Sequence, residues 1–164
     1  MYLVDNKGLL FRYVYNGIEE KYFCVTKDKN KVSEGFIQSY DFYKKEIPID
    51  DPQIESIYDM HYLVDYDTKL ECVPTTWKVD EEEITLTGEK ILLIFGHGRL
   101  PGWEIVENTV CKKMVKIEEV KNIRIVYKYK VKEGKKYDIP LREERTLTIE
   151  EFKQMAEYYR DSNI

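Results

Sequence analysis

The chain has 164 residues and a formal net charge of −5, and no apolar run in it approaches the length of a membrane-spanning helix. Such a helix needs roughly 20 residues, so we expect no membrane partner. The first residues, MYLVD, lack the basic and then apolar layout of a secretory signal, which predicts a cytoplasmic protein. The acidic balance disfavours a protein that binds duplex DNA through an overall positive field.

The amino-acid composition points to a β-rich chain. Tyrosine occurs 14 times, whereas alanine occurs once, at Ala156. Alanine is the best helix former and tyrosine prefers strands, so strands should dominate. Cys24, Cys72 and Cys111 are widely spaced and odd in number, which predicts reduced, buried thiols rather than a disulfide framework or a zinc site. The abundance of Lys, Ile, Tyr, Glu and Asn is typical of an AT-rich coding sequence, as in low-GC bacteria and their phages.

The chain opens with a pattern that predicts a three-stranded antiparallel meander. Strands are expected over residues 1–4, 9–15 and 18–27. The dipeptide Asn16-Gly17 is a strong signal for a two-residue hairpin turn, because both central residues of that turn need positive φ.

Two short helices are predicted in the middle of the chain. Ser33 is a candidate N-cap for a helix with apolar residues at roughly helical spacing: Phe36, Ile37, Tyr40, Tyr43 and Ile47. Asp51 followed by Pro52 is typical of an N-cap and first helical position, and predicts a second helix over residues 52–60. His61 would lie on the packed face of that second helix.

An acidic block, Asp80-Glu81-Glu82-Glu83, follows a predicted strand over residues 69–79. It is the best candidate for a subdomain boundary in what is otherwise expected to be a single domain over residues 1–164. The alternative interpretation is a solvated loop.

A glycine-rich loop follows the longest uncharged apolar run, residues 91–95, which predicts a central buried strand. The loop from Gly96 to Trp103 would place His97, Arg99 and Trp103 at the end of that strand. An imidazole, a guanidinium and an indole there would suit a nucleotide or small anion. The alternative is a structural hairpin loop, since no phosphate-binding signature is completed.

The second half of the chain predicts strands over residues 114–117, 123–131 and 137–141. Tyrosines alternate with lysines in this segment, and the turn Glu133-Gly134 precedes the last strand. The lysine side chains could bind nucleic acid, or they could protect an exposed edge strand from unwanted pairing. The lysines concerned are Lys128, Lys130, Lys132, Lys135 and Lys136.

The C-terminus carries the most complete local signal, which predicts a helix over residues 149–160. Thr148 and Glu151 fit a capping box, and Leu147 and Phe152 fit a hydrophobic staple. An apolar stripe at i, i+3, i+4 and i+7 should pack on the sheet; it comprises Phe152, Met155, Ala156 and Tyr159.

Together these patterns predict an α+β fold: a twisted antiparallel sheet or partly open barrel, one or two short middle helices and a capping terminal helix. No nucleophile, base and orienting group have recognisable spacing, so we expect no enzyme, no catalytic residue, no cofactor and no metal.

The first functional hypothesis is a non-catalytic protein-binding module that inhibits or regulates a partner, of the immunity or phage anti-defence kind. Its expected contacts are acidic: Asp80, Glu81, Glu82, Glu83, Glu143 and Glu144. The alternatives are a nucleotide- or small-anion-binding protein or small enzyme that uses the glycine loop, and a nucleic-acid binder that uses the lysines.

Overall fold

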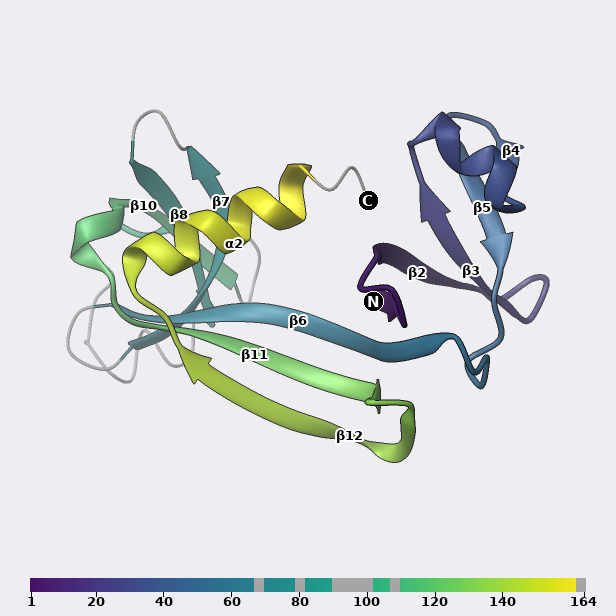
Figure 1. The fold of residues 1–164 in the computed structure, drawn as a ribbon. Coiled ribbons are helices and arrows are strands. Elements are labelled where there is room, and N and C mark those ends of the chain that lie inside the picture. The colour runs from purple at the N-terminus through teal and green to yellow at the C-terminus, as the bar shows by residue number, and fades with distance from the viewer. Residues whose placement is uncertain (67–69, 79–81, 90–101, 107–109, 162–164) are drawn as a thin grey trace. The chain divides into compact units, whose positions relative to one another are not determined.

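A computed structural model describes residues 1–66, 70–78, 82–89, 102–106 and 110–161 (Figure 1). Most described residues lie in antiparallel strands, and the C-terminal helix α2 spans Ile149–Asp161. The strands are β1 Tyr2–Asp5, β2 Leu10–Asn16, β3 Lys21–Thr26, β4 Ile37–Ser39, β5 Phe42–Glu46, β6 Ile54–Tyr66, β7 Leu70–Lys78, β8 Glu83–Glu89, β9 Glu104–Ile105, β10 Val110–Lys116, β11 Lys121–Lys132 and β12 Lys135–Thr146. Within the described residues there are also two short 3₁₀ helices, η1 Lys29–Glu34 and η3 Ile117–Glu119.

This architecture confirms a β-rich α+β class with an antiparallel sheet and a C-terminal helix. Over the residues that the structure describes, the strands form no closed barrel. The prediction of two helices in the middle of the chain is wrong, because strands β4, β5 and β6 occupy those segments.

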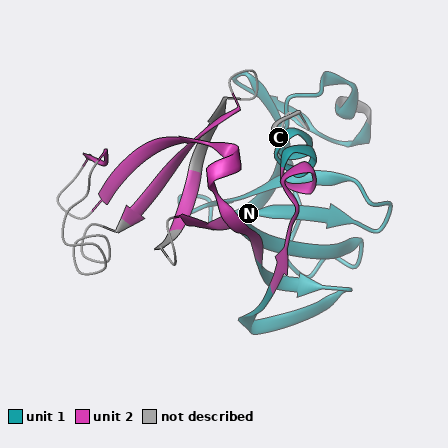
Figure 2. Ribbon diagram, turned by 90° about the vertical axis from the view of Figure 1, so that its left-hand side faces the viewer, with its two compact units in different colours: residues 1–60, 127–143, 153–164 teal, residues 61–126, 144–152 magenta. Residues whose placement is uncertain are grey.

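The chain divides into two compact units (Figure 2). Unit 1 contains residues 1–60, 127–143 and 153–164, and unit 2 contains residues 61–126 and 144–152. Glu82 and Glu83, the described part of the acidic block, belong to unit 2. The prediction of a single domain with a boundary near residues 80–83 stays a prediction.

Unit 1 is built on a run of antiparallel strands in the order β4-β5-β3-β2-β1-β6. The register places Leu3 opposite both Phe11 and Ile57, and Tyr13 opposite Cys24. These five side chains share one face of the sheet and are buried. Phe36, Ile54 and Val131 complete this core. The first two strands predicted at the N-terminus are therefore confirmed.

The first hairpin has a longer loop than predicted. Asn16 pairs with Lys21, so four residues, 17–20, form the loop instead of two. The Asn16 side chain accepts hydrogen bonds from the backbone N–H of Ile18 and of Glu19, and Glu20 takes the left-handed conformation with φ of 54°. The side chain of Asn16 thus forms the turn, and the third strand begins at Lys21 rather than at residue 18.

The helix predicted from Ser33 to Ile47 is a 3₁₀ turn followed by the β4–β5 hairpin. Gly35 has a φ of +87°, which ends the turn, and Tyr40 has a φ of 55° in the two-residue connection between Ser39 and Phe42. Apolar residues at helical spacing also fit a hairpin, because β5 pairs with both β4 and β3 and the sheet thereby supplies the backbone hydrogen bonds.

The helix predicted over residues 52–60 is the first half of β6. Asp51 does cap a turn: its side chain accepts a hydrogen bond from the backbone N–H of Gln53, and its carbonyl accepts one from Ile54. The chain then extends, because β6 pairs with β1. The residue pattern from Ile54 onward is rich in β-branched and aromatic residues, which suits a strand. His61 consequently lies in a strand.

Unit 2 contains the antiparallel order β6-β7-β8-β10-β9. Its core includes Ile84, Leu86, Cys111 and Val115, which are buried. The strand predicted over residues 69–79 is confirmed as β7, and the strand predicted at 114–117 is the end of β10. The predicted strand over residues 91–95 lies outside the described residues.

The hairpin predicted in this segment is confirmed as β11 and β12, although β12 extends to Thr146 and the prediction ended at residue 141. Glu133 and Gly134 have φ values of 52° and 71°, as a two-residue turn requires. Strand β11 pairs with both β12 and β6, whereas β12 pairs with β11. The lysines of β11 therefore lie on a strand that is paired with two others. Among the described residues, β12 is paired with β11 alone.

The terminal helix and its cap are confirmed. The backbone N–H of Thr148 donates to the Glu151 carboxylate at 2.8 Å, and the Glu151 N–H donates to Thr148 Oγ1 at 3.1 Å. In unit 2, Leu147 and Phe152 are buried, and the Phe152 ring contacts Tyr62 edge-on. Of the predicted stripe, Phe152 is the fully buried member, while Met155, Ala156 and Tyr159 are half-buried.

Candidate functional site

The structure places one of the three residues predicted for the glycine loop. His97 and Arg99 lie outside the described residues, as does the strand predicted before them. Trp103 is half-buried, and its ring contacts Tyr66 with centroids 6.2 Å apart. Lys113 covers the same tyrosine, with its Nζ 5.0 Å from the ring centroid. Trp103 thus packs within unit 2.

Three of the acidic residues predicted to bind a partner form ion pairs with cations of the same chain. Glu83 pairs with Lys116 at 3.0 Å. Glu143 and Glu144 pair with Lys132 and Arg124, respectively. Glu82 has a φ of 51° just before β8, and Asp80 and Glu81 lie outside the described residues. These ion pairs leave less negative charge for a partner than the sequence alone implies.

The predicted lysine patch is divided among several environments. Lys128 is exposed, Lys130 is half-buried and Lys132 pairs with Glu143. Lys135 stacks over the ring of Tyr137, with Nζ 5.4 Å from the centroid. Lys136 lines a small cavity of unit 1.

The described side chains offer little for nucleophilic or metal chemistry. Within the described ranges, no group of three or more His, Cys, Asp or Glu side chains is placed to hold a metal ion. All three cysteines are free and buried, as predicted. Burial raises the pKa of the Cys24 thiol to about 12, which keeps it protonated at neutral pH. The sequence prediction of no catalytic residue stays a prediction.

The most exposed aromatic residue that the structure describes lies at the end of the β4–β5 hairpin. Tyr40 is 94% exposed, and Ile37 of the neighbouring strand β4 is 63% exposed. Tyr40 holds a φ of 55°, a left-handed conformation that costs a residue with a side chain about 1–2 kcal/mol. We call Ile37 and Tyr40 the hairpin tip. Of the five described residues other than glycine that have a positive φ, Tyr40 is the one with an exposed aromatic ring.

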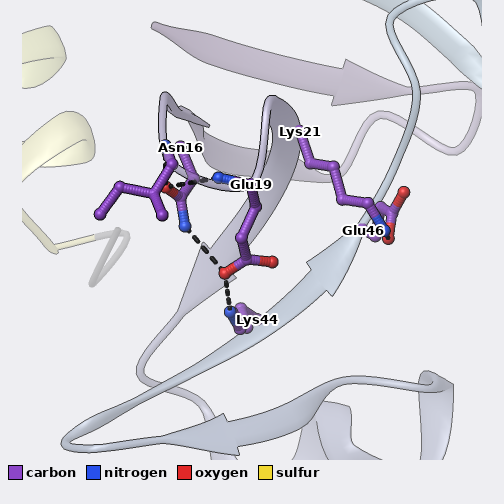
Figure 3. A network of polar contacts seen from close by, with 6 residues as sticks. Asn16, Glu19, Lys21, Lys44 and Glu46 are labelled. Carbon is purple, nitrogen blue, oxygen red and sulfur yellow. Dashed lines mark hydrogen bonds and ion pairs between the residues drawn. The ribbon is translucent and has the colours of Figure 1, made fainter.

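A polar network on strand β5 fixes the strand that carries this tip (Figure 3). Lys44 donates to Glu19 in the β2–β3 loop at 3.3 Å, and the Asn16 amide donates to the same carboxylate. Lys21 pairs with Glu46 at 2.8 Å. Exposed pairs contribute little stability individually, but together they fix β5 beside β3. Lys44 Nζ also lies 4.4 Å from the centroid of the Phe23 ring.

Sequence reasoning missed the hairpin tip because it assigned Ile37 and Tyr40 to the apolar face of a helix. The available signals were Gly35, which favours a positive φ, and Ser39 and Asp41, which favour turns. Exposure itself could not be predicted, since it depends on which strands pair.

Comparisons of the chain with protein families, with curated proteins and with solved structures found no match. Among the helices that the structure describes, none has the length and apolar character needed to cross a membrane.

Proposed function

We propose that the protein is a non-catalytic binding module that inhibits or regulates a partner protein, and that the hairpin tip is its contact. The observation that supports this function is Tyr40, which is both strained and 94% exposed. Glycine would adopt this left-handed conformation at a lower cost, and the Tyr40 side chain is almost fully exposed, so a contact outside the chain would account for a tyrosine at this position.

Tyrosine suits such a role because it offers a large contact area and a hydroxyl group at a low cost in side-chain entropy. Ile37 adds an apolar side chain two residues from Ser39, where the hairpin turns. Tyrosine, unlike the aliphatic residues, is enriched at the energetic centres of interfaces. The hairpin tip replaces the predicted acidic residues as the proposed contact, because Glu83, Glu143 and Glu144 already form ion pairs within the chain.

An affinity capture tests this function. Tagged wild-type protein is incubated with lysate of a low-GC bacterium, with and without nuclease, and bound proteins are identified by mass spectrometry. We expect a dominant protein that survives nuclease treatment. Capture of no protein, or of proteins that nuclease removes, would contradict the proposal and favour the lysines or the glycine loop.

Two variants show whether the captured partner uses the hairpin tip. Tyr40→Gly removes the ring and relieves the left-handed strain, so it should keep the fold and lose the partner. Ile18→Ala is the matched control, since Ile18 is 96% exposed in the β2–β3 loop, outside the hairpin tip. Ile18→Ala should capture the partner as the wild type does.

A further inference from the structure

Unit 1 contains a cavity that is separate from the hairpin tip. Its volume is about 250 Å³, and buried apolar side chains form its floor: Leu3, Phe11, Phe36 and Ile54. The Phe11 and Phe36 rings are stacked, with centroids 5.7 Å apart. The size is below the roughly 300–1,000 Å³ of pockets for drug-sized ligands, so the cavity suits a molecule of amino-acid size.

Two carboxylates that line the cavity, those of Asp5 and Asp51, are held in fixed positions. Asp5 Oδ1 accepts hydrogen bonds from the backbone N–H groups of Lys7 and Leu9, both at 2.9 Å. Asp51 Oδ1 accepts one from the N–H of Gln53 at 2.8 Å. Among the described residues, the structure gives the second oxygen of each carboxylate no hydrogen bond. Each can therefore accept a hydrogen bond from a bound ammonium group.

A positive group lies on the rim with them. Lys45 Nζ donates to the carbonyl oxygen of Glu34 at 2.9 Å and lies 5.9 Å from the centroid of the Phe36 ring. An ammonium group has three donors, so two remain for a ligand. Lys7 also lines the cavity. The rim thus presents both signs of charge around an apolar floor.

We propose that this cavity binds a small zwitterion with an apolar side chain, of the class of an aromatic or branched amino acid. Its ammonium group would contact Asp5 and Asp51, its carboxylate would contact Lys45, and its side chain would lie on the Phe11–Phe36 pair. A simple anion would face two carboxylates, and a simple cation would face a lysine. A zwitterion satisfies both parts of the rim.

Calorimetric titration of the full chain tests the ligand class with four probes. L-Phenylalanine and L-leucine carry both charges, phenethylamine lacks the carboxylate and 3-phenylpropionate lacks the ammonium group. We expect saturable binding of the two amino acids, and affinities at least tenfold lower for the two singly charged probes. Equal affinities for phenylalanine and either singly charged probe would overturn the assignment, as would no saturable binding of any probe at millimolar concentration.

Matched variants locate the site. Asp51→Asn keeps an oxygen that can accept the Gln53 hydrogen bond and removes the charge, so the turn should persist while phenylalanine binds at least tenfold more weakly. Asp41→Asn is the control, because Asp41 is exposed and does not line the cavity. Equal loss in both variants, or in neither, would overturn the site. These titrations use no partner protein. Failure of the cavity to bind an amino acid can therefore be told apart from failure of the proposed binding to a partner.

Discussion

The phenolic oxygens of Tyr58 and Tyr159 lie 2.9 Å apart and share a hydrogen bond, although 101 residues separate the two tyrosines in the chain. Tyr2 completes the contact, with its ring centroid 4.9 Å from that of Tyr159 and 5.8 Å from that of Tyr58. Within unit 1, the end of α2 is therefore attached to β1 and β6 by aromatic packing and one partly buried hydrogen bond.

Removal of this hydrogen bond should destabilise the fold modestly. Tyr159→Phe keeps the ring and leaves the Tyr58 hydroxyl without this partner, so we expect a loss of about 1 kcal/mol in the free energy of unfolding. Urea denaturation followed by circular dichroism measures it. The double variant Tyr58→Phe/Tyr159→Phe should cost less than the sum of the single changes. Additive costs would show that the hydrogen bond contributes nothing.

Stability should fall at alkaline pH because buried tyrosines resist ionisation. Burial raises the pKa of Tyr58 to about 12, from an ordinary value near 10, and also raises the pKa of Tyr13 and Tyr159. Above about pH 10 the unfolded chain loses protons that the folded chain keeps. The stabilisation is therefore complete below pH 10 and is lost as pH rises toward 12. Denaturation at about pH 8, 10 and 11 should show this decline, and Tyr58→Phe should make it shallower; a flat profile would contradict it.

The three cysteines should be unreactive in the folded protein. Cys24, Cys72 and Cys111 are all buried, and the raised pKa of Cys24 leaves almost no thiolate at pH 8. Ellman's reagent should modify them slowly in native buffer and all three rapidly in guanidinium chloride. Rapid modification of one native thiol would show that its strand opens readily.

The capping box of α2 should contribute measurable stability. Thr148→Ala removes the side-chain oxygen that accepts the Glu151 N–H, and such losses cost about 0.5–2 kcal/mol. Thr148→Ser keeps that oxygen and should stay within a few tenths of a kcal/mol of the wild type. Equal destabilisation by alanine and serine would assign the effect to the threonine methyl group.

The features that could be predicted from the sequence are those with local causes. The helix from Ile149 was predictable because its capping residues, staple and apolar stripe all lie within one segment. The turn at Glu133-Gly134 was predictable for the same reason: the preceding strand alternates tyrosine and lysine, and glycine suits the positive φ.

The predictions that were wrong concern features that depend on pairing between distant segments. Residues 33–47 carry apolar side chains at helical spacing, yet β5 pairs with β3 through contacts such as Cys24 with Lys45. Residues 54–60 form a strand instead of a helix, because β1 pairs with the segment from Ile54 to Tyr58. The hairpin tip and the cavity follow from these pairings, since Tyr40 is exposed and Phe11 meets Phe36 only in the folded sheet.

The proposed contact at the hairpin tip is tested most directly by the affinity of the captured partner for wild type, Tyr40→Gly and Ile18→Ala. Calorimetry should give an affinity at least tenfold lower for Tyr40→Gly, with a melting temperature equal to or above that of the wild type because glycine relieves the left-handed strain. Ile18→Ala should bind as the wild type does. An unchanged affinity for Tyr40→Gly would contradict the account.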